Sequence, residues 1–583
     1  MSALSAFLEP VPRPPQRFRS TRVLLAPLLL CLASIAGTRS TEGAALRPMM
    51  KRALVLAESK ASSLESRVVL RAVRQYYQTV EFAPLWVGAK DGARRARALL
   101  RGLEALSGDG LTPADYGAQE LASLLGRSDA GMAGRLEVRL STALVMAASD
   151  LASGRLSPRE VRPDLYIFPQ DVDGKSVLEG VSSHPDINAY LASFQPSQPN
   201  YHRLKAALAH YRALARTHPV WPPLGRGPTM KVGQRDPRVR ALRHRLAVLG
   251  DLPADDVDET DRFDAPLESA VRRFQHRNGL DVDGAVGKDS LRELDLPPAR
   301  RVEQIVLNLE RRRWMADHFE QRYIFVNLAD FALKAVVKHG GREQTVFTTE
   351  VVVGKPYHQT PEFSDRIRYM VVNPYWNVPR SIARNELIPK FKRDPASIAA
   401  RGYELLSAGK ARARPIAPES LDWSELGPRH FPYRIRQLPG PRNALGRVKF
   451  VFPNPYSIYL HDTPARTLFD RRQRAFSHGC IRARNPLDLA AVLLSWQGEG
   501  RERIDAALAS GKRTVIKLAR PVPVHLTYIT AWVNKDGTVH FRRDVYGRDR
   551  ALAEALGLRP SSTHRTGRRR GSAGEVRPRW KTG

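Results

Sequence analysis

Hydrophobic positions recur at helical spacing through the first third of the chain. Apolar side chains fall three or four positions apart within residues 69–77, 98–106 and 140–147, and another such segment begins at Tyr201. This period gives each segment one apolar face, which is typical of amphipathic helices. We therefore expect residues 50–222 to form a helical scaffold domain that ends in a proline-rich linker.

A second, shorter helical unit follows the linker. Residues 239–246 and 267–274 each carry an apolar helical face, and glycines then allow tight turns between short helices. The stretch Phe274-Gln-His-Arg-Asn-Gly-Leu-Asp-Val-Asp-Gly-Ala-Val-Gly287 resembles the peptidoglycan-binding domain 1 family, a small three-helix module. The resemblance implies a wall-binding module at residues 235–296.

After residue 301 the pattern changes to segments rich in β-branched and aromatic residues, of which the first two have the form of a hairpin. Strands are predicted at residues 323–328, 332–337, 346–353, 367–372, 449–452, 457–460 and 514–518. Between about residues 381 and 431 this pattern stops, and helical segments with a basic surface take its place. We expect a mostly-β domain at residues 301–520 with a helical insertion that can cover a site as a lid.

The last part of the chain carries one strong turn signal. Asn534-Lys-Asp-Gly537 predicts a hairpin within residues 522–541, as part of a hairpin and helix extension over residues 521–557. Residues 558–583 are rich in Arg, Ser, Gly and Pro without apolar periodicity, which is typical of a disordered basic tail. The predicted fold class is therefore multi-domain α+β.

The composition agrees with a folded protein of several domains. A chain of 583 residues predicts three or four domains, and its 42% hydrophobic and 26% charged residues exclude the disordered class for the bulk of the chain. The formal net charge of +34 fits an anionic wall polymer or membrane surface as partner, and it equally fits solvated arginine faces. No zinc-finger, homeodomain or RNA-recognition pattern accompanies this charge, so nucleic acid is not an expected partner.

The first 40 residues have the features of an export signal. Arginines within residues 13–22 precede the apolar run at residues 23–36, which ends in a small-x-small cleavage motif. Because the run is short for a membrane span, we expect a cleaved signal peptide, with an uncleaved N-terminal anchor as the alternative. Export places the protein in the periplasm or cell envelope. Cleavage would remove Cys31 and leave Cys480 as an unpaired thiol, a candidate for reactivity.

Two short segments carry the candidate chemistry. The predicted strand at residues 457–460 ends at His461, and the sequence Ser477-His478-Gly479-Cys480 precedes a predicted helix at residues 486–494. Asn485 is a candidate N-cap of that helix. A histidine base and a cysteine nucleophile in this order fit acyl transfer.

The thiolate is the reactive form of a cysteine. The nearby helix N-terminus, His461 and Arg482 would each favour the thiolate of Cys480. Gly479 permits a tight turn whose backbone N–H groups can point at an oxyanion. Two alternatives remain at this stage. One is a buried, inert cysteine, and the other is a zinc site of His461, His478 and Cys480, for which no fourth ligand is evident.

The same residues resemble a known signature. His461 followed by Ser477-His478-Gly479-Cys480 is similar to the L,D-transpeptidase catalytic domain, the YkuD family, and the flanking sequences match its large multi-domain, YcbB-like type. Those flanking sequences are Met370-Val-Val-Asn-Pro-Tyr-Trp-Asn-Val-Pro379, Arg436-Gln-Leu-Pro-Gly-Pro-Arg-Asn-Ala-Leu-Gly446, Lys449-Phe-Val-Phe-Pro-Asn454 and Leu460-His-Asp-Thr-Pro464. The resemblance covers about residues 60–550. At the position of Arg482, smaller members of the family often have Asn, whereas the large members commonly have Arg.

The resemblance implies a peptidoglycan L,D-transpeptidase. Cys480 would attack the third residue of a tetrapeptide stem, release D-Ala and form a thioester, which an amine of a neighbouring stem would convert into a 3–3 cross-link. His461 would act as general base and then acid. A backbone carbonyl is the better orienter of this imidazole, because the adjacent Asp462 points to the other side of an extended segment. No cofactor and no metal are implied, and the expected partners are stem peptides and glycan.

Further residues are candidates for holding the oxyanion or positioning the substrate, namely Ser477, His478, Gly479, Arg482, Trp376 and Tyr459. His478 would contact substrate or orient its own loop. Arg482 would bind a substrate carboxylate or make a surface ion pair. The two aromatic residues would line a groove or belong to the core.

Three other functions remain open from the sequence. A non-catalytic peptidoglycan-binding scaffold protein has no need of an intact His461 and Cys480 pair. A metal-dependent wall peptidase requires more ligand-spaced His and Asp residues than the chain provides. A nucleic-acid binder would show strongly salt-dependent affinity for DNA without binding the wall.

Overall fold

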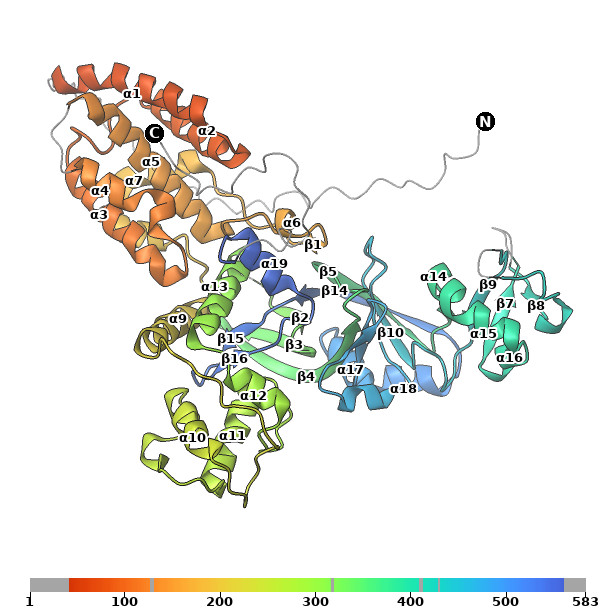
Figure 1. Ribbon diagram of the computed structural model, residues 1–583. Coiled ribbons are helices and arrows are strands. Elements are labelled where there is room, and N and C mark those ends of the chain that lie inside the picture. The colour runs from red at the N-terminus through yellow and green to blue at the C-terminus, as the bar shows by residue number, and fades with distance from the viewer. Residues whose placement is uncertain (1–40, 126–129, 316–318, 408–412, 428–429, 560–583) are drawn as a thin grey trace, which may run out of the picture.

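The computed structural model describes residues 41–125, 130–315, 319–407, 413–427 and 430–559. The predicted signal peptide or anchor at residues 1–40 and nearly all of the predicted basic tail lie outside these residues. The described chain is multi-domain α+β, as predicted, with helices at the N-terminal end and a large sheet in the C-terminal half (Figure 1). None of the described helices is both long and apolar enough to cross a membrane.

The N-terminal region is a helical assembly around α5 (Ala130–Ser153), whose side chains are buried along most of its length. On α5, the buried Glu137 accepts hydrogen bonds from the Val87 N–H and the Tyr77 hydroxyl, each at 2.7 Å, and this pairing joins a loop to the helical core. The other elements are α1 (Thr41–Lys60), α2 (Leu64–Thr79), α3 (Gly92–Ala105), η1 (Leu106–Asp109), η2 (Pro113–Tyr116), α4 (Ala118–Leu125), α6 (Pro158–Val161), β1 (Leu165–Tyr166), α7 (Gly174–Ser183) and α8 (Ile187–Ala192).

A three-helix module lies at the bottom of Figure 1. Its elements are α10 (Arg238–Val248), η3 (Ala254–Asp256), α11 (Ala265–Arg277) and α12 (Lys288–Leu294). The predicted apolar faces meet in one core that includes Leu242, Leu246, Val271 and Phe274. Two longer helices, α9 (Pro199–Thr217) and α13 (Pro298–Trp314), pack together and connect this module to the scaffold helices and to the sheet.

The main sheet closes on itself. Its order is β1-β5-β10-β11-β13-β4-β3-β2-β14, and a further pairing of β14 with β5 joins the two ends. The strands are β2 (Arg322–Asn327), β3 (Ala332–His339), β4 (Arg342–Gly354), β5 (Glu362–Val372), β10 (Val448–Val451), β11 (Leu460–His461), β12 (Ala475–Ser477), β13 (Ile481–Ala483) and β14 (Thr514–Thr527). β15 (Ala531–Val533) and β16 (Val539–Phe541) pair antiparallel across residues 534–537, and α19 (Arg548–Ala555) follows.

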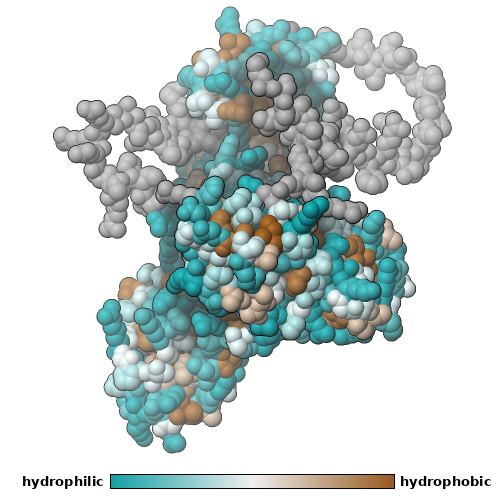
Figure 2. Space-filling view, turned by 90° about the vertical axis from the view of Figure 1, so that its right-hand side faces the viewer, coloured by the Kyte–Doolittle hydropathy of each residue, from teal (hydrophilic) through white to brown (hydrophobic). Residues whose placement is uncertain are grey.

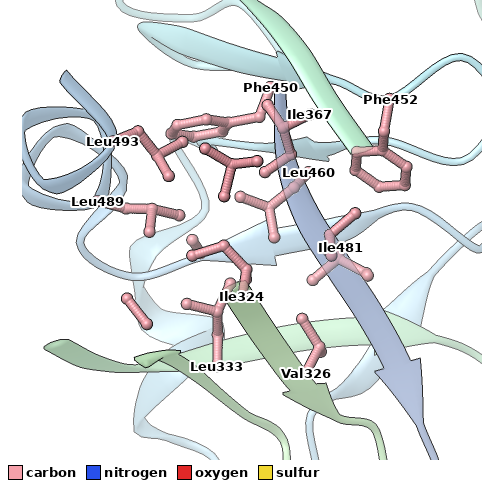
Figure 3. Packing of buried hydrophobic residues seen from close by; sticks show 14 of the residues in the cluster. Ile324, Val326, Leu333, Ile367, Phe450, Phe452, Leu460, Ile481, Leu489 and Leu493 are labelled. Carbon is pink, nitrogen blue, oxygen red and sulfur yellow. The ribbon is translucent and has the colours of Figure 1, made fainter. Parts of the chain in front are cut away.

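One face of the closed sheet holds the main hydrophobic core. Phe450 of β10, Leu460 of β11 and Ile481 of β13 are fully buried there, against Leu489 and Leu493 of α17 (Pro486–Ser495) (Figure 3). α18 (Glu502–Ala509) and η6 (Arg466–Asp470) complete this part of the chain. Because side chains alternate across a strand, the neighbours of these core residues point to the opposite face. The core therefore determines which side chains the three short strands display outside.

The insertion lies at the right of Figure 1, away from the scaffold helices. Its elements are β6 (Trp376–Asn377), α14 (Arg380–Ile382), η4 (Ala383–Leu387), α15 (Ile388–Arg393), α16 (Ser397–Ala400), β7 (Tyr403–Leu406), β8 (Pro415–Ile416), η5 (Pro418–Ser420) and β9 (Arg434–Gln437). It has its own small core, which includes Phe391, Leu405 and Ile435. Figure 2, seen from this side, shows a mostly hydrophilic surface with small hydrophobic spots. The sequence predicted its helices but missed the sheet β6-β9-β7-β8, because strands of two to four residues are too short to show a period.

Two further predictions of local structure are corrected. The predicted strand at residues 457–460 is mostly a turn, and only Leu460 and His461 form β11. The Asn454 side chain causes this, because it accepts the N–H groups of Tyr456 and Ile458, each at 3.1 Å, and Ser457 adopts a φ of 56°. In addition, the strand predicted at residues 514–518 continues to Thr527 as β14, whereas the hairpin predicted around residues 534–537 is present.

Candidate active site

Three polar side chains form a row on the outer face of the closed sheet. The strand register places Lys449 of β10 beside His461 of β11, and His461 beside Arg482 of β13. Paired residues on neighbouring strands project to the same face, so the imidazole lies between an ammonium and a guanidinium group. Tyr459 and Cys480 come just before β11 and β13, and the Tyr459 side chain contacts both Lys449 and Cys480.

His461 is held in one orientation by the backbone. Its side chain is 4% exposed, and its Nδ1 is hydrogen-bonded to the carbonyl oxygen of Asp462. A carbonyl can only accept, so Nδ1 carries the proton and Nε2 is left as the acceptor. The Asp462 carboxylate is engaged elsewhere, because it accepts the Arg447 N–H at 2.8 Å. The expected backbone orienter is thus present, and it is the carbonyl of the adjacent residue.

The imidazole of His461 is neutral in this environment. Burial, together with the positive charges of Arg482 and Lys449, lowers its pKa to about 3, against the opposing effect of the Asp462 carbonyl. Nε2 is therefore unprotonated at any ordinary pH and is available as a hydrogen-bond acceptor. A charged imidazolium is disfavoured until something offsets the two cations.

Cys480 lies in a half-buried position at the end of a tight loop. Its Sγ is 3.7 Å from the Ser457 carbonyl oxygen. Gly479 has a φ of 116°, which a residue with a Cβ rarely adopts. The Ser477 hydroxyl fixes this loop by donating to the Cys480 carbonyl at 2.6 Å and accepting the Gly479 N–H at 3.0 Å. Ser477 thus supports the loop, and the Gly479 N–H is already used inside it.

The helix predicted after Cys480 is present, and a short strand stands between it and the thiol. β13 separates Cys480 from α17, which begins at Pro486, and the Asn485 side chain makes no capping hydrogen bond. Burial raises the pKa of the Cys480 thiol, although hydrogen bonds from Tyr459 and the charges of Lys449 and Arg482 act in the opposite direction. The resting state is therefore a neutral thiol near a neutral imidazole.

Of the two predicted aromatic residues, Tyr459 contacts the thiol and Trp376 contacts Tyr459. The Tyr459 ring is 3.7 Å from the Lys449 Nζ, and its centroid is 5.5 Å from that of His461. Burial raises the pKa of Tyr459, as does its hydrogen-bonded contact with Cys480, while a hydrogen bond with the Trp376 side chain lowers it. Trp376 lies on β6 at the root of the insertion. The chain Trp376, Tyr459, Cys480 therefore connects the insertion to the nucleophile.

His478 and Arg482 differ in their surroundings. The His478 Nε2 lies 2.6 Å from the Glu386 carboxylate in η4 of the insertion, so this histidine holds the loop against the insertion. Arg482 makes none of the ion pairs found among the described residues, and its buried Nε has no hydrogen-bond partner among them. Within the same residues, no group of three or more His, Cys, Asp or Glu side chains is arranged to hold a metal ion.

Three domain families match the chain. The L,D-transpeptidase catalytic domain family, YkuD, matches residues 321–516 and includes every residue of the row. Residues 321–516 form an L,D-transpeptidase catalytic domain. The family described as “Putative peptidoglycan binding domain” matches residues 235–294, and the scaffold domain family matches residues 71–208.

Two known proteins have sequences similar to parts of this chain. A “Putative L,D-transpeptidase” of Haemophilus influenzae is 36% identical over 250 residues, which are 43% of this chain and 49% of that protein. The N-acetylmuramoyl-L-alanine amidase CwlM of Mycobacterium tuberculosis is 39% identical over 75 residues, 12% of this chain and 18% of that protein. The chain thus matches about half the length of the first of these proteins and less of the second.

Among solved structures, an L,D-transpeptidase of Stackebrandtia nassauensis aligns with 51% of this chain and 94% of its own at 13% identity. The L,D-transpeptidase of Xylanimonas cellulosilytica aligns with 52% and 98% at 14% identity. Their TM-scores of 0.20 and 0.16 are too low to add to the fold described above.

Two residues of the L,D-transpeptidase domain were not singled out from the sequence. Lys449 stands among apolar residues in the strand Lys449-Phe-Val-Phe452, and a lone charge in such a strand was the available signal. Only the register of β10 and β11 places it beside His461. No local sequence pattern pointed to Glu386, because its partner His478 is 92 positions away and lies on a different unit of the fold.

Proposed function

We propose that the protein is a peptidoglycan L,D-transpeptidase in which Cys480 is the nucleophile and His461 the general base and acid. The observation that carries the proposal is the buried, backbone-oriented His461 on the strand next to the Cys480 loop, within a domain of the L,D-transpeptidase family. The match to a peptidoglycan-binding family in the same chain supports the wall as substrate.

The donor is a tetrapeptide stem. The His461 Nε2 accepts the Cys480 proton as Sγ attacks the carbonyl carbon of the third residue. The bond from that carbon to the D-Ala nitrogen then breaks, and the imidazolium returns its proton to the leaving amine. A thioester remains on Cys480.

Transfer to the acceptor reverses these roles. The side-chain amine of a diamino acid in a neighbouring stem attacks the thioester, and His461 takes one proton from the attacking nitrogen. The new amide is the 3–3 cross-link. The carbon–sulfur bond breaks, and the imidazolium gives the proton back to the sulfur, which restores the resting enzyme.

The electrostatics favour a proton transfer that accompanies the attack. A neutral thiol and a neutral imidazole are the resting forms, so a separated thiolate and imidazolium pair is not formed in advance. Tyr459, Lys449 and Arg482 stabilise the sulfur as negative charge develops on it. Because the Gly479 N–H is used within the loop, we assign the oxyanion to the Cys480 N–H.

The remaining candidates have supporting roles in this proposal. Ser477 and Gly479 shape the loop, and Trp376 and Tyr459 border the stem. The three-helix module holds the enzyme on glycan or stem peptides, and the protein works in the periplasm or cell envelope after export. No cofactor or metal takes part.

The test uses the purified full chain and tetrapeptide-bearing wall fragments. We expect mass spectrometry to detect free D-Ala, a thioester adduct on Cys480 and a cross-linked dimer. Cys480→Ala should lose all three, and a zinc chelator should leave the native protein active. Products formed by Cys480→Ala would contradict the mechanism, and loss of activity with the chelator would favour a metal-dependent peptidase. Wall binding without any product would favour a non-catalytic scaffold.

A further inference from the structure

A cationic cavity shares Lys449 with the candidate site and lies on its insertion side. It measures about 410 Å³ and is bordered by β5, β10 and the segments around β6 and β9. The polar side chains at its wall are Tyr369, Tyr375, Asn377, Arg436, Lys449 and Arg513. None of its wall residues is acidic.

The positive charge of this cavity is only partly neutralised within the protein. Arg436 pairs with Glu404 and lies 4.4 Å from the centre of the Tyr375 ring. Among the described residues, no carboxylate lies within ion-pair distance of Lys449 or Arg513. Lys449 is half-buried, and an unpaired buried cation is costly unless an anion or water compensates it.

Lys449 is shared by the cavity and the site. Its strand neighbour is His461, and its Nζ lies 3.7 Å from the centre of the Tyr459 ring, which contacts Cys480. A group bound in the cavity against Lys449 is therefore one side chain away from both the nucleophile and the base. This distance suits a part of the donor stem rather than a remote part of the wall.

We propose that this cavity binds a free carboxylate of the donor stem between Lys449 and Arg513, with the Asn377 amide as a further donor. Charge-assisted hydrogen bonds from an ammonium and a guanidinium group are the strong contacts that a carboxylate makes. This carboxylate site rests on the proposed transpeptidase function, to which it adds a recognition site for the donor stem. A stem has more than one free carboxylate, and the test below distinguishes them.

Binding of that carboxylate changes the base as well. Lys449 is one of the two cations that lower the pKa of His461. A carboxylate against Lys449 offsets that charge, so the pKa of His461 rises when the stem is bound. The imidazole would then be a stronger base in the complex with the stem than in the free protein.

The test measures equilibrium binding to full-length Cys480→Ala protein, with and without Arg513→Gln. The probes are a tetrapeptide stem with all carboxylates free and three versions amidated at the terminal D-Ala, at the diamino acid or at the γ-linked Glu. We expect one amidation to weaken binding about tenfold and Arg513→Gln to weaken the free stem about fivefold. That variant should also discriminate less against the same amidated stem. Lys512→Gln removes the adjacent exposed charge outside the cavity and should bind like the parent.

The outcomes separate the two proposals. Equal affinity of Cys480→Ala protein for all four stems, no binding of any stem, or the same preference in the Arg513→Gln protein would overturn the cavity as a carboxylate site. Release of D-Ala by the native protein would then still support the transpeptidase. Conversely, stem binding with the expected preference but no thioester on Cys480 would support the cavity and contradict the mechanism.

Discussion

At the scale of single residues, the site depends on charges that the protein leaves uncompensated. Lys449 and Arg482 stand on either side of His461, and both favour a negatively charged sulfur while they disfavour a charged imidazole. Burial acts against charge on both reacting groups. The thiol and the imidazole are therefore both neutral in the structure.

The charge of Lys449 can be tested through the reactivity of the thiol. Lys449→Met removes a cation that lowers the pKa of Cys480, so this pKa should rise further. Because only the thiolate is alkylated, the rate with iodoacetamide at pH 8 should fall severalfold, and its pH profile should move to higher pH. Lys334→Met, on β3, is the matched control and should leave the profile in place. An unchanged profile in Lys449→Met would show that this charge does not act on the sulfur.

At the scale of elements, short strands and the insertion position the site together. β11 and β13 have only two and three residues, yet Leu460 and Ile481 anchor them in the core and so direct His461 and Arg482 outward. The insertion reaches the same place from the other side through the contact of Glu386 with His478. The nucleophile loop is thus held between a rigid sheet and a separate unit.

Loss of the Glu386 contact should affect substrate binding more than stability. Half-exposed ion pairs contribute about 1 kcal/mol or less, so Glu386→Gln should keep its thermal midpoint within a few degrees. The loop and insertion would separate more readily, and we expect KM for D-Ala release to rise about threefold to fivefold with little change in kcat. Glu419→Gln, on η5 of the insertion, is the control. A large fall in the thermal midpoint with unchanged KM would make the contact purely structural.

At the scale of the whole molecule, ion pairs connect the three-helix module to its surroundings. The buried Glu293 of α12 accepts from Arg301 of α13 at 2.9 Å and from Arg543, beyond β16, at 2.8 Å. Burial alone would raise the pKa of Glu293, but Arg301 and Arg543 outweigh it and hold this pKa below its usual value. The module is therefore attached through charge as well as through apolar contact.

This attachment predicts a dependence of stability on acid. A depressed carboxylate pKa contributes stability above its unfolded value, near pH 4.3, and that contribution is lost as the pH falls through the folded pKa. Glu293→Gln removes the carboxylate partner of the buried Arg301 and one of the two carboxylate partners of Arg543, and should destabilise the protein by about 3 kcal/mol at pH 7. The difference in unfolding free energy between this variant and the parent protein, measured by denaturant unfolding, should shrink below about pH 4. Glu303→Gln on α13 is a control of the same type, and an equal deficit at both pH values would contradict the assigned role.

The sequence by itself determined the types of unit and the candidate reacting residues. Helical and alternating periods are local properties, so they predicted the scaffold helices, the three-helix module and most long strands. The motif around Cys480 and the presence of His461 are likewise properties of short segments. The turn at Asn454 and the strands of the insertion were missed, because side-chain hydrogen bonds and pairing partners override weak local preferences there.

Only the tertiary structure decided how these residues act. The pKa values of Cys480 and His461 depend on burial and on charges from other strands. The expected effect of Arg482 on the thiol is joined there by that of Lys449 and is opposed by burial. The register of β10, β11 and β13 aligns three residues that are up to 33 positions apart in the chain. Electrostatic interactions depend on distance in space, and no period along the chain encodes that distance.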